Sequence, residues 1–227
     1  MKKLVILTGA GISAESGIQT FRGAGGLWNG HDIMEVATPQ GWQKNPSLVN
    51  EFYNLRRKDA AEAKPNAAHT GLADLQEQYD VWVITQNVDD LHEKGGSKQV
   101  MHLHGKLSEV RSSKDPQLVY EIGGQAVQLG DKCEKGSQLR PNVVWFGEDV
   151  PMLPHAAHLC SEADIFVVIG TSMAVYPAAS LIDYVPAPVQ KYIIDPNMPA
   201  IPNYISNVTK IAKKATEGVA ELKRLLG

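Results

Sequence analysis

The sequence predicts an α/β fold in which helices cover both faces of a parallel β-sheet and a smaller lobe is inserted. Two observations predict the sheet: short β-branched runs that end at polar or glycine turns, and helical stretches between several of these runs. A third observation predicts the lobe, because two segments interrupt the alternation. We therefore expect a layered sheet with an antiparallel excursion beside it.

Each regular element follows from its local pattern. Buried strands are expected where apolar residues run for five or six positions, at residues 3–8, 81–85, 165–170 and 191–195. Helices are expected where apolar residues recur at helical spacing, at 67–79, 153–163 and 216–227. This alternation favours parallel strands, which need helical crossovers and are buried on both sides.

Two segments do not fit the alternation. Residues 106–140 are polar, contain glycines and lack a long helical period, so they predict an inserted antiparallel lobe. Residues 23–65 form the second interruption, and 45–63 within them have helical character.

Composition limits the class of protein. The chain has 227 residues, of which 43% are hydrophobic, so it can bury a real core. Its formal charge is -3, without long runs of one sign, so nothing indicates a nucleic-acid or membrane partner. No apolar stretch approaches the roughly 20 residues that span a bilayer, and a cytoplasmic protein is expected. Two cysteines are too few for a disulfide framework or a four-thiolate zinc site.

The glycine-rich turn after the first strand is the first candidate site. Residues 9–14, "GAGISA", fit a strand–turn–helix cradle in which backbone N–H groups approach a phosphate at a helix start. A tight turn without a ligand explains the same glycines and stays open. The glycine-rich "TFRGAGGLW" follows where a dehydrogenase would continue its helix, which suggests a flap over a cofactor.

Polar side chains at other strand ends add to this candidate site. Gln86, Asn87 and Asp89 follow a predicted strand, and amides with a carboxylate suit ribose hydroxyls and a carboxamide. In "HLHG", His102 and His104 alternate, so we expect one to face a cleft and the other the core.

Six motifs in series then identify a resemblance. The segments "GAGISAESGI", "TFR", "TQNVDDLH", "HLHG", "RPNVVWFGE" and "GTSMAVYPA" resemble those of the sirtuins, the NAD-dependent protein-lysine deacylases, and the likeness, of the bacterial type, covers nearly the whole chain. The resemblance implies a Rossmann-like part, a small lobe and a cleft between them for NAD and an acyl-lysine peptide. It divides residues 1–227, one catalytic domain, into a large part at about 1–22, 66–105 and 141–227 and a small lobe at about 23–65 and 106–140.

The resemblance also implies roles for individual residues. The catalytic group comprises His104 as base with Asn87 and Asp89. The NAD-binding residues are Gly9, Ala10, Gly11, Glu15, Thr20, Phe21, Arg22, Gln86, Asn87, Asp89, Gly170, Thr171, Ser172, Asp195 and Asn197. The lysine tunnel is walled by Val144, Phe146 and Val175, while His102 is expected to be structural.

The implied chemistry explains these residue types. In the family the acyl oxygen attacks the ribose carbon as nicotinamide leaves, and Phe21 would shield that centre from water. His104 would remove a proton from the ribose hydroxyls, since imidazole titrates near neutral pH. The products are nicotinamide, free lysine and acyl-ADP-ribose. An NAD hydrolase, an ADP-ribosyltransferase or a non-catalytic NAD-metabolite binder remains the alternative.

The chain departs from the family at its zinc site. The family often carries two Cys-x-x-Cys pairs, whereas this chain has Ser112, Asp115, Lys132 and Lys135 there, with Cys133 off register. No metal is therefore expected. Packing of the lobe's apolar residues is expected to replace zinc, and these residues are Val110, Leu118, Val119, Tyr120, Ile122, Val127 and Leu129. A second departure puts Asp195 where the family tends to have Asn, so either Asp195 or Asn197 is expected at the adenosine ribose.

The acyl group is suggested by Tyr53, Arg56 and Ala24. Tyr53 and Arg56 stand three apart, so on a helix they share one face. Spacing alone allows a packed Tyr53 and a solvated Arg56. The pair matches the Tyr-x-x-Arg signature of desuccinylase-like sirtuins, and Ala24 matches the small residue of their wider acyl pocket. The resemblance thus implies removal of succinyl and malonyl groups, and also of acetyl.

Overall fold

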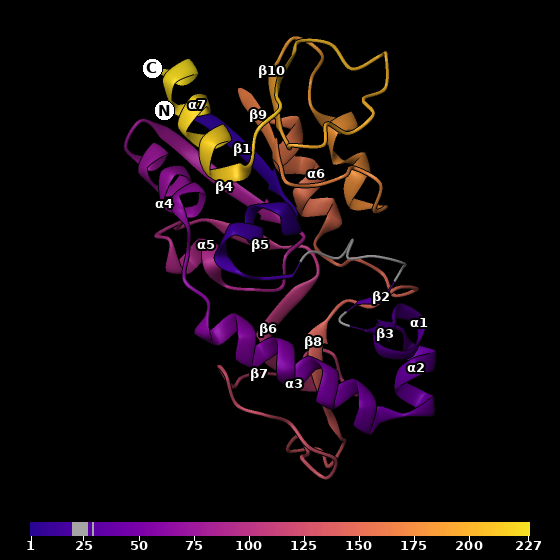
Figure 1. The fold of residues 1–227 in the computed structure, drawn as a ribbon. Helices are drawn as coiled ribbons and strands as arrows, with labels where there is room; N and C mark the ends of the chain where they lie inside the picture. Colours follow the sequence, from indigo (N-terminus) through magenta and orange to yellow (C-terminus); the bar gives the residue numbers. More distant parts are fainter. Residues whose placement is uncertain (20–26, 29) are drawn as a thin grey trace.

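The computed structural model describes residues 1–19, 27–28 and 30–227 of the chain (Figure 1). Its largest element is a sheet in which every neighbouring pair is parallel. In spatial order its six strands are β11 (Val208–Ile211), β10 (Gln190–Ile194), β9 (Ile165–Ile169), β1 (Lys2–Thr8), β4 (Tyr79–Thr85) and β5 (Val100–His102). The predicted parallel sheet is confirmed, with its expected strands shifted by at most two residues.

The central strand β1 shows why the sheet needs cover on both faces. Leu4 and Ile6 pack into the core under helices α4 (Ala67–Asp74) and α7 (Ala215–Leu226). The alternate residues Val5 and Leu7 pack into a second core under α6 (Leu153–Ser161) and the 3-10 helix η4 (Ala178–Tyr184). Because all four side chains are fully buried, the helices lie on both faces as predicted.

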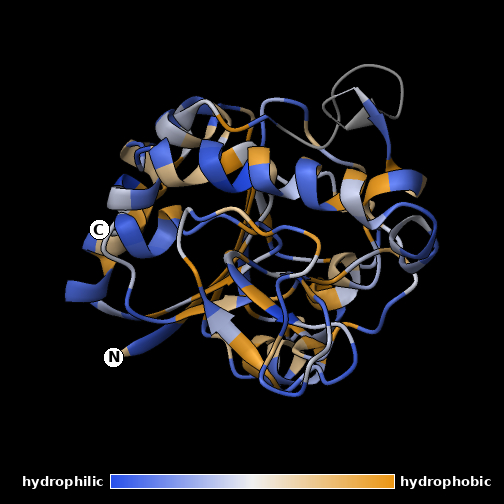
Figure 2. Cartoon of the chain, turned by 90° about the horizontal axis from the view of Figure 1, so that it is seen from below, coloured by the Kyte–Doolittle hydropathy of each residue, from blue (hydrophilic) through white to orange (hydrophobic). Residues whose placement is uncertain are grey.

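A separate antiparallel sheet forms the predicted lobe. Its strands, in spatial order, are β7 (Val119–Glu121), β6 (Gly105–Ser112) and β8 (Leu139–Val143). The long helix α3 (Pro46–Glu62) runs along this sheet at the bottom of Figure 1 and contacts β6 and β8. Asn45 starts α3, since its side chain accepts a hydrogen bond from the Leu48 N–H (3.1 Å). Seen from below in Figure 2, α3 carries both hydrophobic and hydrophilic residues, as expected of a half-buried helix.

Shorter elements complete the described chain. They are η1 (Ala10–Ile12), η2 (Ala14–Ser16), β2 (Leu27–Trp28), β3 (His31–Asp32), α1 (Ile33–Val36), α2 (Pro39–Lys44), η3 (Leu75–Glu77) and α5 (Leu91–Lys94). Sequence analysis did not predict β5 or β11, because strands of three and four residues carry too little periodicity. Among the helices that the structure describes, none has both the length and the hydropathy needed to cross a membrane.

The expected core of the lobe is partly wrong. Val110 and Val127 are buried, as predicted. Val119 and Leu129 are instead 42% and 53% exposed, because β7 is an edge strand and Leu129 lies in a loop. Fewer side chains than expected therefore stabilise this lobe by packing.

Candidate active site

A cavity of about 920 Å3 lies at the carboxyl ends of the parallel strands. The residues that follow β1, β4, β9 and β10 line it, namely 9–11, 86–89, 170–172 and 195–197. From β1 the strand order runs to β4 and β5 on one side and to β9, β10 and β11 on the other. The cavity thus lies where the strand order reverses, which is where open α/β sheets bind ligands, and its volume is in the range of ligand sites.

The cavity collects every predicted site residue that the structure describes. These are Gly9, Ala10, Gly11, Glu15, Tyr53, Arg56, Gln86, Asn87, Asp89, His104, Val144, Phe146, Gly170, Thr171, Ser172, Val175, Asp195 and Asn197. The predicted residues Thr20, Phe21, Arg22 and Ala24 lie outside the described part of the chain.

The glycine turn differs from the predicted strand–turn–helix cradle. Two 3-10 turns, η1 and η2, follow β1, and no longer helix begins there. Gly11 donates its N–H to the carbonyl of Gly170 (2.9 Å), and a Cβ on Gly11 would lie 2.6 Å from the Gly170 Cα. Gly170 itself has φ of 62°, the left-handed region that glycine tolerates. These glycines are thus needed for close packing of two turns, whatever the cavity binds.

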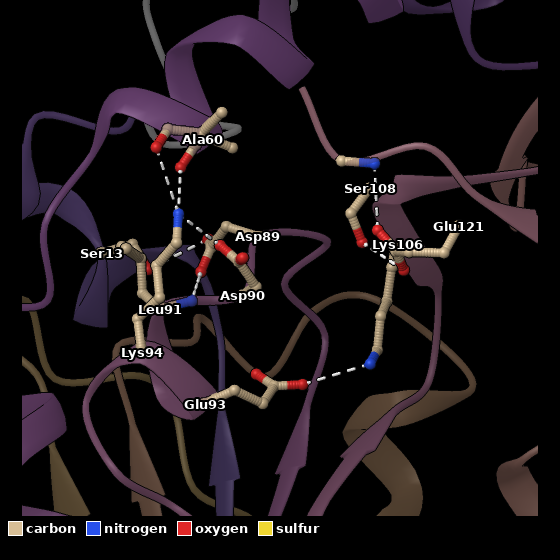
Figure 3. A network of polar contacts seen from close by, with 12 residues as sticks. Ser13, Ala60, Asp89, Asp90, Leu91, Glu93, Lys94, Lys106, Ser108 and Glu121 are labelled. Carbon is tan, nitrogen blue, oxygen red and sulfur yellow. Dashed lines mark hydrogen bonds and ion pairs between the residues drawn. The ribbon is translucent and has the colours of Figure 1, made fainter. Parts of the chain in front are cut away.

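Asn87 and Asp89 belong to a buried hydrogen-bond network under the cavity. The Asn87 side-chain N–H donates to Ser13 Oγ (3.0 Å), and the Ser13 hydroxyl donates to Asp89 Oδ2 (3.1 Å). The Leu91 N–H donates to the other carboxyl oxygen of Asp89 (3.2 Å), as Figure 3 shows. Burial raises the pKa of Asp89, against the effect of these hydrogen bonds. Lys94, in the same view, donates to the carbonyl of Ala60 and so ties α5 to the end of α3.

His104 is a candidate base with a defined tautomer. Its Nδ1 lies 3.0 Å from the carbonyl oxygen of Gln86, which can only accept, so Nδ1 carries the proton. Nε2 is then the basic nitrogen of a residue that lines the cavity. Burial lowers the pKa of His104, so its imidazole is neutral at pH 7.

His102 faces the other way, as the alternation predicted. It is buried, and its ring nitrogens contact the Asn87 carbonyl (3.1 Å) and Glu93 Oε1 (2.8 Å). Lys106 forms a further ion pair with Glu93 (3.3 Å). The contact with His102 therefore helps to hold the backbone of Asn87 in place.

Helix α3 presents Tyr53 and Arg56 to the same cavity. Arg56 is only 8% exposed, so it is not the solvated charge that spacing alone allowed. Burial lowers its pKa to about 10, which still leaves the guanidinium charged at neutral pH. Its guanidinium carbon lies 5.7 Å from the Phe52 ring centroid. A buried cation in the cavity wall favours an anionic ligand group.

The remaining predicted residues have additional roles. Both carboxyl oxygens of Glu15 accept hydrogen bonds from Thr216, one from its N–H (3.1 Å) and one from its hydroxyl (2.9 Å), at the start of α7. Asp195 accepts a hydrogen bond from the Asn197 N–H (2.8 Å). The backbone N–H of Val144 donates to the carbonyl of His104 (2.9 Å). Phe146, which also lines the cavity, is 43% exposed.

Sequence reasoning missed the contacts made by Trp145 and Glu148. Both line the cavity, and the only signal was their place inside "RPNVVWFGE". Glu148 pairs with Arg140 (2.7 Å) and accepts the Trp145 backbone N–H (2.8 Å). The Trp145 indole N–H donates to the hydroxyl of Tyr53 (3.1 Å).

The positions that match the family's zinc ligands carry an ion pair. Lys135 Nζ lies 2.8 Å from Asp115 Oδ2. Ser112 Oγ accepts hydrogen bonds from the backbone N–H groups of Lys114 (3.3 Å) and Asp115 (3.2 Å), which closes this turn. Within residues 1–19, 27–28 and 30–227, no group of three or more metal-binding side chains occurs.

Comparisons with known proteins agree with this geometry. Residues 9–177 match the Sir2 family, the sirtuins. An "NAD-dependent protein deacylase" of Bacteroides thetaiotaomicron is 52% identical over 100% of this chain and 98% of its own length. One of Helicobacter pylori strain 26695 is 58% identical over 86% of this chain and 85% of its own length.

A solved structure of a Sir2 homologue in complex with NAD is similar throughout. It is 41% identical, with a TM-score of 0.87, and the match covers 100% of this chain and 91% of that one. With this agreement in sequence, fold and strand-end cavity, the chain belongs to the Sir2 family.

Proposed function

We propose that the chain is an NAD-dependent protein-lysine deacylase that removes succinyl and malonyl groups as well as acetyl groups. The products are nicotinamide, acyl-ADP-ribose and free lysine. One observation carries the proposal: a base with a fixed tautomer, His104, and a buried cation, Arg56, line the same strand-end cavity. Family membership and the names of the relatives support the coarser part, NAD-dependent deacylation.

The residues at the strand ends fit NAD. The cavity combines small residues after β1 and β9 with the amides of Gln86 and Asn87 and the carboxylate of Asp195. Hydroxyls, amides and a carboxylate are the groups that bind ribose and carboxamide, and the cavity lies at the topological switch point. Bound NAD supplies the ribose carbon that the acyl oxygen attacks as nicotinamide leaves. In this proposal Thr171 and Ser172 lie on the adenosine side and Asp195 or Asn197 holds the adenosine ribose.

His104 is the proposed general base. The Gln86 carbonyl holds the proton on Nδ1, so Nε2 has its lone pair available for a ribose hydroxyl proton. Asn87 and Asp89 complete the proposed catalytic group. Both side chains form hydrogen bonds with Ser13, and these bonds hold them in position. Side chains that are already in position need little rearrangement during the reaction.

Tyr53 and Arg56 are the proposed readers of the acyl chain. A guanidinium beside a phenol hydroxyl binds a distal carboxylate by charge-assisted hydrogen bonds, each worth about 1.5–3 kcal/mol. The lysine stem would pass Val144, Phe146 and Val175 to reach His104. Acetyl-lysine has no distal carboxylate, so we expect it to be accepted without help from Arg56.

Mass spectrometry of NAD with a panel of acyl-lysine peptides tests the proposal. We expect peptide-dependent release of nicotinamide, with acyl-ADP-ribose and free lysine formed in equal amounts from succinyl, malonyl and acetyl peptides. Nicotinamide release without any peptide would instead indicate an NAD hydrolase, and ADP-ribose on protein would indicate a transferase. NAD that stays intact under every condition would indicate a binding module.

A further inference from the structure

A side chain at the start of α4 holds the turns that follow β1. The Asn66 Nδ2 donates to the carbonyl of Ile12 (2.8 Å) and to the hydroxyl oxygen of Ser16 (3.0 Å), which are the last residues of η1 and η2. The Asn66 Oδ1 accepts the N–H of Ala68 in α4 (2.9 Å). A backbone N–H can only donate and a carbonyl can only accept, so these partners fix which way the amide points.

These contacts stabilise the break at Ser13 between the two 3-10 turns. In a continuous α-helix the Ser16 N–H would donate to the Ile12 carbonyl, four residues back. It donates instead to the Ser13 carbonyl (3.0 Å), and the Asn66 amide supplies the donor that Ile12 then lacks. Gly17 ends the second turn in the left-handed region, with φ of 85°. Asn66 therefore favours the broken form of this segment over a helical one.

The break determines what the segment presents to the cavity. Ala14 and Glu15, in η2, line the cavity wall. Ser13 points to the buried network, where its hydroxyl donates to Asp89 and accepts from Asn87. A continuous α-helix would point residues 13–15 in other directions, because it has about 3.6 residues per turn rather than about 3.0.

We propose that Asn66 is a positioning residue for NAD, because its amide holds the break that shapes this wall of the cavity. The inference rests on the proposed function and adds a residue that acts through the turns at 10–16. If only a fraction of the molecules has the broken form, the apparent affinity for NAD falls by that fraction. Asn66 thereby raises the affinity for NAD from behind the wall.

The support for this amide is itself held in place. The backbone N–H of Asn66 donates to His69 Nδ1 (3.2 Å), one turn into α4. Ala68 and Leu72 on the same helix are fully buried in the core under the sheet. On the other side of the segment, the Glu15 carboxylate accepts hydrogen bonds from Thr216 at the start of α7. The turns are thus anchored to two helices, and Asn66 makes the contact with the break.

The variant Asn66→Asp tests the proposal. Aspartate still accepts the Ala68 N–H and caps a helix as well as asparagine does, but it replaces the donating Nδ2 by an oxygen that faces the Ile12 carbonyl. In calorimetry without peptide, we expect the Kd for NAD to rise at least about fivefold, the effect of two lost hydrogen bonds. At saturating NAD, kcat should stay within about twofold, because bound NAD restores the broken form.

The matched control is Asn54→Asp. The Asn54 Nδ2 also donates to a backbone carbonyl, that of Val127 (2.8 Å), but it does so between α3 and the antiparallel lobe. The same chemical change at this position should leave the Kd for NAD unchanged within about twofold. A rise equal to that of Asn66→Asp would show that general destabilisation, and not the break, weakens binding.

A second pair of variants keeps the proposal testable if Asn66→Asp does not fold. Serine at position 66 caps α4 with its hydroxyl but is too short to bridge Ile12 and Ser16. Asn66→Ser should weaken NAD binding at least about fivefold. Ser16→Ala removes one of the two acceptors and should weaken it about two- to threefold. In the Asn66→Ser background, Ser16→Ala should have almost no further effect, because its partner is gone.

The outcomes separate this inference from the proposed function. An unchanged Kd for NAD in the Asn66 variants of a protein that turns over NAD and acyl-lysine would contradict the inference alone. A fall in kcat with an unchanged Kd would also overturn it, since that pattern indicates a merely structural role. A wild-type protein that does not bind NAD would contradict the proposed function as well.

Discussion

His104 Nδ1 lies 3.0 Å from the carbonyl oxygen of Gln86, and this contact fixes which ring nitrogen can act as a base. Gln86 follows β4 and its N–H donates to the carbonyl of Thr8 at the end of β1 (2.9 Å). The orientation of the imidazole is thus set by the backbone of the central sheet. A base held by backbone geometry needs no neighbouring carboxylate to choose its tautomer.

Replacing His104 with Gln should lower kcat for every acyl-lysine peptide at least about 100-fold, since a general base contributes about 10²–10⁴-fold. NAD binding, measured by calorimetry, should change little. The control is His155→Gln, an exposed histidine on α6, which should retain full activity. Retention of more than a tenth of wild-type kcat by His104→Gln would rule out this role.

The pH dependence of activity should reflect the burial of His104. Burial lowers the pKa of its imidazole, so protonation and loss of the base occur at lower pH than for a free histidine. We expect kcat/KM for an acetyl peptide to fall on the acid side with a midpoint below the ordinary value of about 6.5. A profile from pH 5 to 9 measures this midpoint, and a value above 6.5 would contradict the prediction.

Replacing Arg56 with Met should reduce desuccinylation at least about tenfold, because it removes the proposed charge-assisted contact to the distal carboxylate. Acetyl-lysine turnover should be nearly unchanged. Lys58→Met is the matched control, since Lys58 is an exposed cation two residues further along α3. Parallel loss of both activities in Arg56→Met would show that Arg56 does not read the acyl chain.

Two buried histidines should make stability depend on pH. Burial lowers the pKa of His69 to about 4 and that of His92 to about 3. Between these values and the unfolded value of about 6.5, the unfolded chain binds protons that the folded chain does not, so acid destabilises the fold. Urea unfolding should show a loss of about 1.6 kcal/mol per histidine between pH 6.5 and pH 5.

The variant His69→Gln should lose about 1.6 kcal/mol less over the same pH interval. His69 Nδ1 accepts the Asn66 N–H at the start of α4 (3.2 Å), and a Gln side chain can take over this capping contact. An unchanged slope of stability against pH in the variant would show that His69 is not one of the titrating groups.

Chelation should leave the protein intact. The positions that match the family's cysteine pairs carry the Lys135–Asp115 ion pair instead. We expect the Tm and the deacylase activity to be the same before and after treatment with a strong zinc chelator. Elemental analysis giving near-stoichiometric zinc, together with unfolding on chelation, would contradict this.

The sequence by itself determined the four inner strands of the central sheet and the polar residues that follow them. Apolar runs such as residues 4–7 define buried strands, and parallel strands bring their carboxyl ends to one edge. Polar residues just past those strands, such as Gln86 and Asp195, therefore had to come together. The apolar runs and the polar residues after them lie within short segments of the sequence, so they can be recognised without knowledge of any tertiary contact.

Only the tertiary structure decided which side chains are buried and what they contact. The spacing of Tyr53 and Arg56 places both side chains on one face of a helix. The burial of Arg56, however, depends on the other elements that line the cavity. Val119 and Leu129 are apolar and yet exposed, since Val119 lies on the edge strand β7 and Leu129 lies in a loop. The Trp145–Tyr53 hydrogen bond joins residues 92 positions apart. Such contacts depend on how distant segments pack, and no periodicity or motif in either segment encodes them.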